Sequence, residues 1–225
     1  MDLYQHVERS RFLGRELLLH LWFETEIMEG TLSTKKTGSF GMWVEKEISL
    51  SVEKETTKIR GGLPAKAREA KEALLLGKMP DKMGFRLVRG EREASFVLRG
   101  DTLSLSAVAL PTVLEEEEPE RIDAPPERPR KKPRERNADA EMERVEVEAQ
   151  EGFFERMHLL REVEEVVEAL YSDFLALRLG PAHRAFVADA IVAWVNGTFT
   201  ESHVETYLKK RKAALASAAL VSKRT

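Results

Sequence analysis

The chain of 225 residues contains no cysteine, and only 7% of its residues are aromatic. The lack of cysteine excludes disulfide bonds and thiolate chemistry. No apolar run is long enough to span a bilayer, and acidic residues interrupt the N-terminal stretch where a signal peptide would be apolar. We therefore expect a cytoplasmic protein that makes no membrane contact.

Motifs that carry catalysis are also missing. There is no Gly-x-Ser-x-Gly turn for a serine nucleophile. Residues 38–41 include two glycines, but they lack the Gly-Lys-Ser/Thr helix start that a phosphate-binding loop requires. The five histidines are scattered without ligand spacing. We expect a protein that is not an enzyme and that has no cofactor and no metal.

One predicted helix face combines two carboxylates with an imidazole. Glu16, His20 and Glu24 follow one another at i, i+4 spacing in a helix predicted for residues 3–28, whose apolar residues fall near one broad stripe. Such side chains could converge on a divalent metal. No second histidine pair supports a metal site, so our interpretation is a solvated helix face.

The stretch 42–110 predicts a small, mostly antiparallel sheet with one covering helix. Apolar and polar residues alternate in short runs, the period-two pattern of strands. A helix is predicted for residues 65–76, because a proline stands in its first turn and a glycine follows its end. Gly100-Asp101 indicates a hairpin, and a shift of apolar phase predicts a bulge or a strong twist near Ala107. Residues 29–41 are predicted to be a loop.

One motif upstream of this stretch and three within it form a recognisable set. They are Arg11-Phe-Leu-Gly-Arg-Glu16, Lys58-Ile-Arg-Gly, Ala73-Leu-Leu-Leu-Gly-Lys78 and Ala94-Ser-Phe-Val-Leu98. The set resembles the second half of the recombination-associated RdgC family, over roughly residues 8–114 and, more weakly, 151–178. The resemblance implies a sequence-independent DNA-binding protein that forms dimers and modulates a strand-exchange recombinase. It also implies that the family's N-terminal half is missing from this chain.

Charge is distributed unevenly, although the net charge is only −3. Residues 34–111 and 207–225 have an excess of Lys and Arg, whereas residues 138–178 have an excess of Asp and Glu. Such asymmetry indicates nucleic-acid contact or self-association more than the net charge does.

The sheet is the first candidate for nucleic-acid contact. If the apolar side chains of the strands face the covering helix, their neighbours form a basic opposite face. This face carries Lys58, Arg60, Arg86 and Arg99. It could contact phosphates and release their counterions, or it could be an ordinary solvated face of an antiparallel sheet.

Two further basic clusters are candidates. Residues 115–137 contain five prolines and predict a disordered linker between a region of residues 1–114 and a helical region of residues 138–225. The linker candidates are Arg128, Arg130, Lys131, Lys132 and Arg134, and the C-terminal candidates are Lys209, Lys210, Arg211 and Lys212. Both clusters could bind DNA, pair with acidic segments or simply be solvated.

A long helix is predicted from Asp139 to about Gly180. Its apolar residues recur at spacings of three or four, and this heptad-like seam needs a partner helix. We expect an α+β fold and a non-catalytic protein that binds DNA of any sequence as a homo-oligomer. The alternative is an interaction protein that assembles through the sheet and the long helix.

Overall fold

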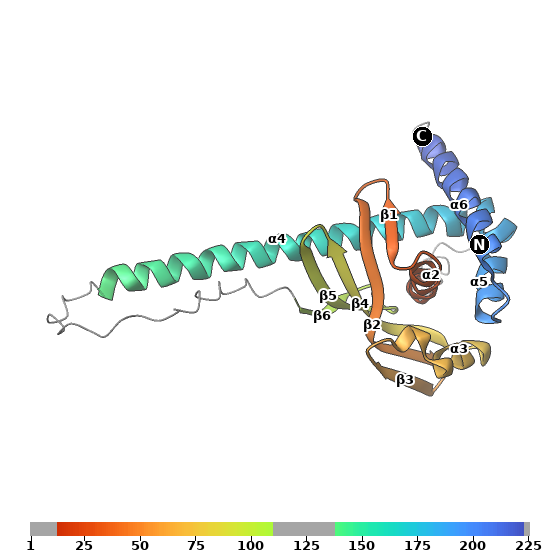
Figure 1. The fold of residues 1–225 in the computed structure, drawn as a ribbon, viewed down its shortest axis with the longest axis horizontal. Helices are drawn as coiled ribbons and strands as arrows, with labels where there is room; N and C mark the ends of the chain where they lie inside the picture. Colours follow the sequence, from red (N-terminus) through yellow and green to blue (C-terminus); the bar gives the residue numbers. More distant parts are fainter. Residues whose placement is uncertain (1–12, 110–137, 223–225) are drawn as a thin grey trace, which may run out of the picture.

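The computed structural model describes residues 13–109 and 138–222, and it confirms the predicted α+β fold (Figure 1). The elements follow in the order α2 (Leu13–Ile27), β1 (Thr31–Thr34), β2 (Gly38–Val52), β3 (Glu55–Gly61), the 3-10 turn η1 (Pro64–Lys66), α3 (Arg68–Leu75), β4 (Met79–Arg89), β5 (Arg92–Arg99), β6 (Leu105–Ala109), α4 (Ala138–Leu179), the π-helical turn η2 (His183–Val187), α5 (Ala188–Val195) and α6 (Glu201–Ser222). The predicted linker lies outside the described residues. None of the described helices is long and apolar enough to cross a membrane.

The strands form one antiparallel sheet in the order β1-β2-β4-β5-β6, and β3 pairs with the second half of β2. The prediction of a loop over residues 29–41 is wrong, because β1 and the start of β2 form a hairpin there. The sequence signal was weak, since β1 has four residues and only Leu32 among them is apolar.

The register of the sheet shifts at three places. The register between β5 and β6 shifts between Ser95 and Val97, and Ala107 opposite this shift has a φ of 49°, which confirms the predicted bulge. A second shift separates Val44 from Ile48 in β2, where Lys46 has a φ of 67°. Val44 and Ile48 are four residues apart, so both would face the core in a regular strand, whereas Lys46 between them is exposed at this shift. A third shift separates Ser49 from Leu50.

A single hydrophobic core joins the sheet to the helices. The short helix α3 does not cover the sheet alone, because α2 and α4 also contribute to this core. Its fully buried side chains come mainly from α2 and the central strands: Leu17, Leu18, Leu21, Trp22, Phe23, Ile48, Met83, Phe85, Phe96 and Leu98. Helix α4 adds Val163, Val166, Leu170 and Phe174.

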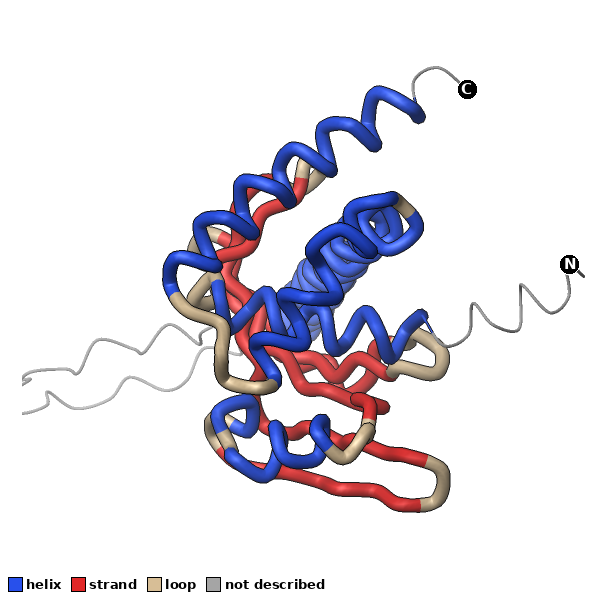
Figure 2. The backbone as a smooth tube through the Cα atoms, turned by 90° about the vertical axis from the view of Figure 1, so that its right-hand side faces the viewer, coloured by secondary structure: helices blue, strands red, loops and turns tan. Residues whose placement is uncertain are grey.

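The C-terminal helices pack on the side of α2 that the sheet leaves uncovered. Phe23 of α2 has the rings of Trp194, Phe199 and Tyr207 around it, with centroids 5.0 to 5.7 Å away. Figure 2 looks nearly along α4, and α6, the helix that leads to the marked C-terminus, runs obliquely past it. Part of the predicted seam of α4 is therefore covered within one chain.

Glu26 joins α2 to its neighbours through hydrogen bonds. Its Oε1 atom accepts a bond from the indole of Trp22 at 2.8 Å, and Oε2 accepts bonds from Trp194 at 2.8 Å and Lys71 at 2.9 Å. The Lys71 ammonium also lies over the Trp194 ring, 4.7 Å from the centroid. One carboxylate thus connects α2, α3 and α5.

Gly14 provides a test of the packing between α2 and the β5–β6 connection. Alanine would ordinarily favour a helix by about 1 kcal/mol over glycine. A Cβ atom at Gly14 would overlap the backbone carbonyl oxygen of Gly100. Gly14→Ala should therefore lower the free energy of unfolding by about 1–3 kcal/mol, as measured by chemical denaturation.

Gly62→Ala is the matched control, because a Cβ atom there meets nothing within 4 Å. It should change the free energy of unfolding by less than about 0.5 kcal/mol. A Gly14→Ala protein as stable as this control would contradict the close approach of α2 to Gly100.

Candidate nucleic-acid interface

The sheet face that points away from the core carries three cations in a row that spans four strands, with Ser49 of β2 between the first two. Ser49 of β2 pairs with Lys58 of β3 on one side and with Lys82 of β4 on the other, and Lys82 pairs with Arg99 of β5. Directly opposed residues of antiparallel strands share a face. The row therefore spans three inter-strand spacings, about 14 Å.

Carboxylates of the same face balance part of this charge. Glu47 forms ion pairs with Lys82 and, at 3.8 Å, with Arg60, and Nε of Arg86 lies 3.0 Å from Glu45. We define the basic sheet face by five cations and three carboxylates: Lys58, Arg60, Lys82, Arg86 and Arg99 with Glu45, Glu47 and Glu93. Within the described part of the chain, Lys58 and Arg99 make no ion pair, and both are exposed.

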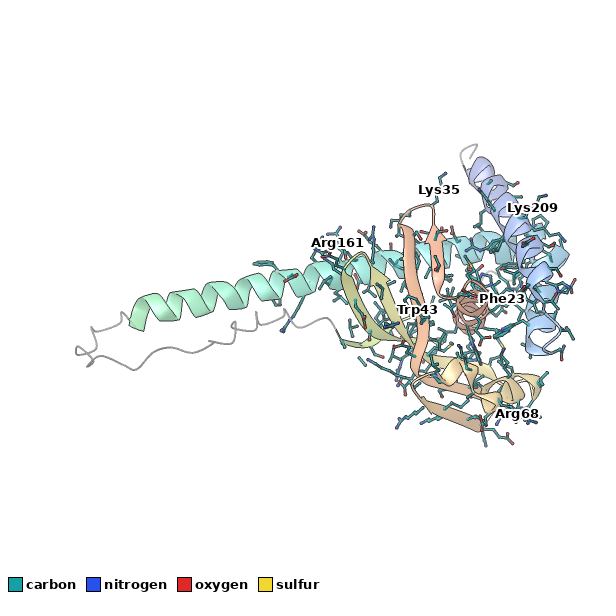
Figure 3. The ribbon with its side chains drawn as sticks, viewed as in Figure 1. Phe23, Lys35, Trp43, Arg68, Arg161 and Lys209 are labelled. Carbon is teal, nitrogen blue, oxygen red and sulfur yellow. The ribbon has the colours of Figure 1, made fainter. Side chains whose placement is uncertain are left out.

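Trp43 lies on this face beneath Arg86. The guanidinium of Arg86 is 4.8 Å from the indole centroid, and Figure 3 shows Trp43 in the middle of the sheet. A Cβ atom at Gly30 or Gly41 would overlap the indole, so these glycines make room for the ring. The Trp43 indole therefore supports the Arg86 guanidinium on the basic sheet face.

The C-terminal basic cluster divides between surface and interior. Lys209, Lys210 and Lys212 are exposed on α6, and Lys209 is labelled in Figure 3. Arg211 is only 8% exposed and pairs with a carboxylate of α2, so it is removed from the candidate contacts. The linker candidates Arg128, Arg130, Lys131, Lys132 and Arg134 lie outside the described residues.

The residues considered for a metal are buried instead of solvated. His20 and Glu24 are 3% and 1% exposed, so the prediction of a solvated face is wrong for them. Arg211 donates from Nη2 to Oε2 of Glu24 at 3.0 Å, Tyr207 donates its hydroxyl proton to Oε1 at 3.1 Å, and Nε2 of His20 lies 3.2 Å from Oε1. The cause is α6, which covers this side of α2.

Glu16, the third of these residues, pairs with Arg178 of α4. Among the described residues, no group of three or more His, Cys, Asp or Glu side chains could hold a metal ion. The three residues therefore join helices within this part of the chain.

The electrostatics of the Glu24 cluster indicate a structural role. Burial raises the pKa of Glu24, but His20 and Arg211 lower it by more, to about 2. Burial and the neighbouring Glu24 charge raise the pKa of Tyr207. Burial lowers the pKa of Arg211, and Glu24 raises it by more, so the net shift is upward. Glu24 and Arg211 therefore stay charged and Tyr207 stays neutral near pH 7, so none of these three is poised for proton transfer.

No protein-family model, curated protein or solved structure matches this chain. The resemblance to the RdgC family therefore rests on the sequence motifs alone. Function has to be inferred from the surfaces that the chain itself presents.

The Glu24 cluster predicts a pH dependence of stability. The pKa of Glu24 falls from the ordinary 4.5 to about 2 on folding. A carboxylate with a lowered pKa stabilises the fold above its unfolded pKa, and this stabilisation is lost as pH falls from 4.5 toward 2. Glu24→Gln should remove this loss, about 3 kcal/mol at most by the size of the shift, in denaturation series across this range. In the wild-type protein burial raises the pKa of Asp173 and the Glu24 charge adds to that rise, so Asp173 contributes there with the opposite sign.

The variant also needs a control for the charge that it leaves behind. Glu24→Gln strands a buried guanidinium and should lower stability at neutral pH by about 3–5 kcal/mol. Combining it with Arg211→Met removes that charge and should restore part of the loss. If Glu24→Gln instead keeps the wild-type slope between pH 4.5 and 2, the assignment of the slope to Glu24 is wrong.

Proposed function

We propose that this chain is a non-catalytic protein that binds DNA without sequence preference, through its basic sheet face and the exposed lysines of α6. The observation that carries this proposal is the row of Lys58, Lys82 and Arg99 across four strands. Duplex DNA presents one phosphate charge about every 1.7 Å along its axis. A row about 14 Å long therefore meets several phosphates at once.

The carboxylates of the basic sheet face form exposed ion pairs with its cations. Lys82 and Arg60, which share Glu47, have side chains that are 36% and 76% exposed. Ion pairs at such sites contribute about 0–1 kcal/mol, so a phosphate can replace the carboxylate at little cost. Cations that meet phosphates carry no sequence information, which supports binding without sequence preference.

Removing the two unpaired cations should weaken DNA binding. Each lost phosphate contact lowers the slope of log K against log salt by about 0.9. Lys58→Gln combined with Arg99→Gln should thus reduce the slope by about 2 and the affinity by more than about tenfold near 100 mM salt. Fluorescence anisotropy titrations with unrelated duplex sequences, at several salt concentrations, measure both quantities.

Two matched variants show whether the sheet face or the total charge is responsible. Lys35→Gln combined with Lys66→Gln removes two exposed cations from other surfaces and should have a much smaller effect. Glu47→Gln removes the carboxylate that competes with phosphate and should raise the affinity. The proposal would be refuted if the Lys35/Lys66 double variant lost as much DNA affinity as the Lys58/Arg99 double variant. It would also be refuted if the intact chain bound no DNA.

A second candidate function is assembly through α4. Phe153, Phe154 and Met157, here called the α4 patch, are 58%, 66% and 50% exposed. Farther along the same helix, Phe174 and Leu177 are covered. In Figure 1 the first half of α4 extends away from the rest of the fold. Contiguous exposed apolar side chains of this kind usually mark an interface, which supports self-association.

The α4 patch predicts a concentration-dependent mass. Light scattering of the intact chain over a concentration series should show a dimer that dissociates on dilution. Replacing all three patch residues with Gln should give a monomer at every concentration, because the apolar contact is lost. Leu76→Gln, at a leucine that is 74% exposed on another surface, is the control. A monomeric wild-type chain at every concentration would rule out this interface.

A further inference from the structure

A pocket of about 290 Å³ is lined in part by Lys210, one of the exposed lysines of α6. Residues of η2, α5 and the start of α6 line it, and its wall includes the rings of Phe186, Phe199 and Tyr207. Phe186 belongs to η2, a π-helical turn, and such turns are rare and often occur at functional sites. The pocket is thus aromatic and lies next to a basic surface.

The rings of the pocket are held in place from behind. Tyr207 is 2% exposed, and its hydroxyl is bonded to Glu24. Phe186 packs edge-on against Tyr207, with centroids 5.7 Å apart. Phe186 and Phe199 are partly buried, and the Phe199 ring also packs against His203 with centroids 5.5 Å apart. Aromatic surface therefore remains accessible in the pocket on a rigid support.

Polar groups stand around these rings. Nζ of Lys210 is 5.8 Å from the centroid of Phe186. Nδ1 of His203 accepts a hydrogen bond from the backbone N–H of Thr200 at 3.1 Å, so in the neutral ring the proton is on Nε2. His203, Asp189 and Thr206 also line the pocket. They offer hydrogen-bond donors and acceptors to a flat polar molecule.

We propose that this pocket takes one unstacked base of single-stranded DNA. The inference rests on the proposed DNA-binding function and adds the form of DNA that is preferred. Proteins that bind single strands combine a basic groove with aromatic rings on which bases stack. Here Phe186 and Phe199 provide the rings, and Lys210 meets the adjoining phosphate. A base inside a duplex is already stacked between its neighbours and does not reach the pocket.

The test compares two strands that differ only in their bases. An oligothymidylate and an abasic strand of the same length carry the same phosphates, and a duplex serves as the third probe. The intact chain should bind the oligothymidylate about tenfold more tightly than the abasic strand, the effect of stacking one base. Phe186→Leu keeps an apolar side chain but loses the aromatic face. It should abolish this preference and leave the affinities for the abasic strand and the duplex unchanged.

Tyr171→Leu is the control, because it replaces a partly buried aromatic ring that lies outside the pocket and outside the α4 patch. It should keep the preference, and thermal unfolding checks that both variants are folded. If the intact chain binds both strands equally well, the pocket assignment is wrong while the proposed DNA binding stands. If it binds no DNA, both are wrong. A folded Phe186→Leu protein that keeps the preference also overturns the pocket assignment.

Discussion

The buried ion pair between Glu24 and Arg211 is the interaction on which the arrangement of the helices depends. Removing an ion from water costs several kcal/mol, so a carboxylate that is 1% exposed requires its partner in place. The partner comes from α6, together with the hydroxyl of Tyr207. Any other position of α6 along α2 would leave one of the two charges uncompensated. The aromatic contacts around Phe23 bury further apolar surface, whereas the ion pair fixes the position of α6 along α2.

The same pair explains why the C-terminal basic cluster is divided. Successive residues of an α-helix are about 100° apart, so four consecutive cations cannot all face one side. Arg211 points inward to Glu24, and Lys209, Lys210 and Lys212 remain outside. The choice of arginine for the inner position agrees with its planar, bidentate geometry. All three lysines stay exposed, and Lys210 also lines the aromatic pocket.

Local signals in the sequence were sufficient for most of the elements. Glycine, proline and alternation gave the fold class and the bulge at Ala107, and the start of α4 agrees with the predicted Asp139 within one residue. Contacts between distant segments were not visible, and Glu24 and Arg211 are 187 residues apart. Without that contact, Glu24 resembled a surface residue and Arg211 a DNA contact. Lys82 was missed because β4 starts before the first clear alternation, at Phe85. The cation row became visible only from the strand register.

Helix α4 has a mechanical consequence. Its second half is fixed in the core by Val163, Val166 and Leu170, and the same helix continues without a break for the residues before them. The 21 residues from Ala138 to His158 extend it by about 30 Å. A rotation of one degree at the base would therefore move the far end by about half an ångström. A small rotation of α4 where it packs against the core would therefore become a larger displacement at the far end of the helix.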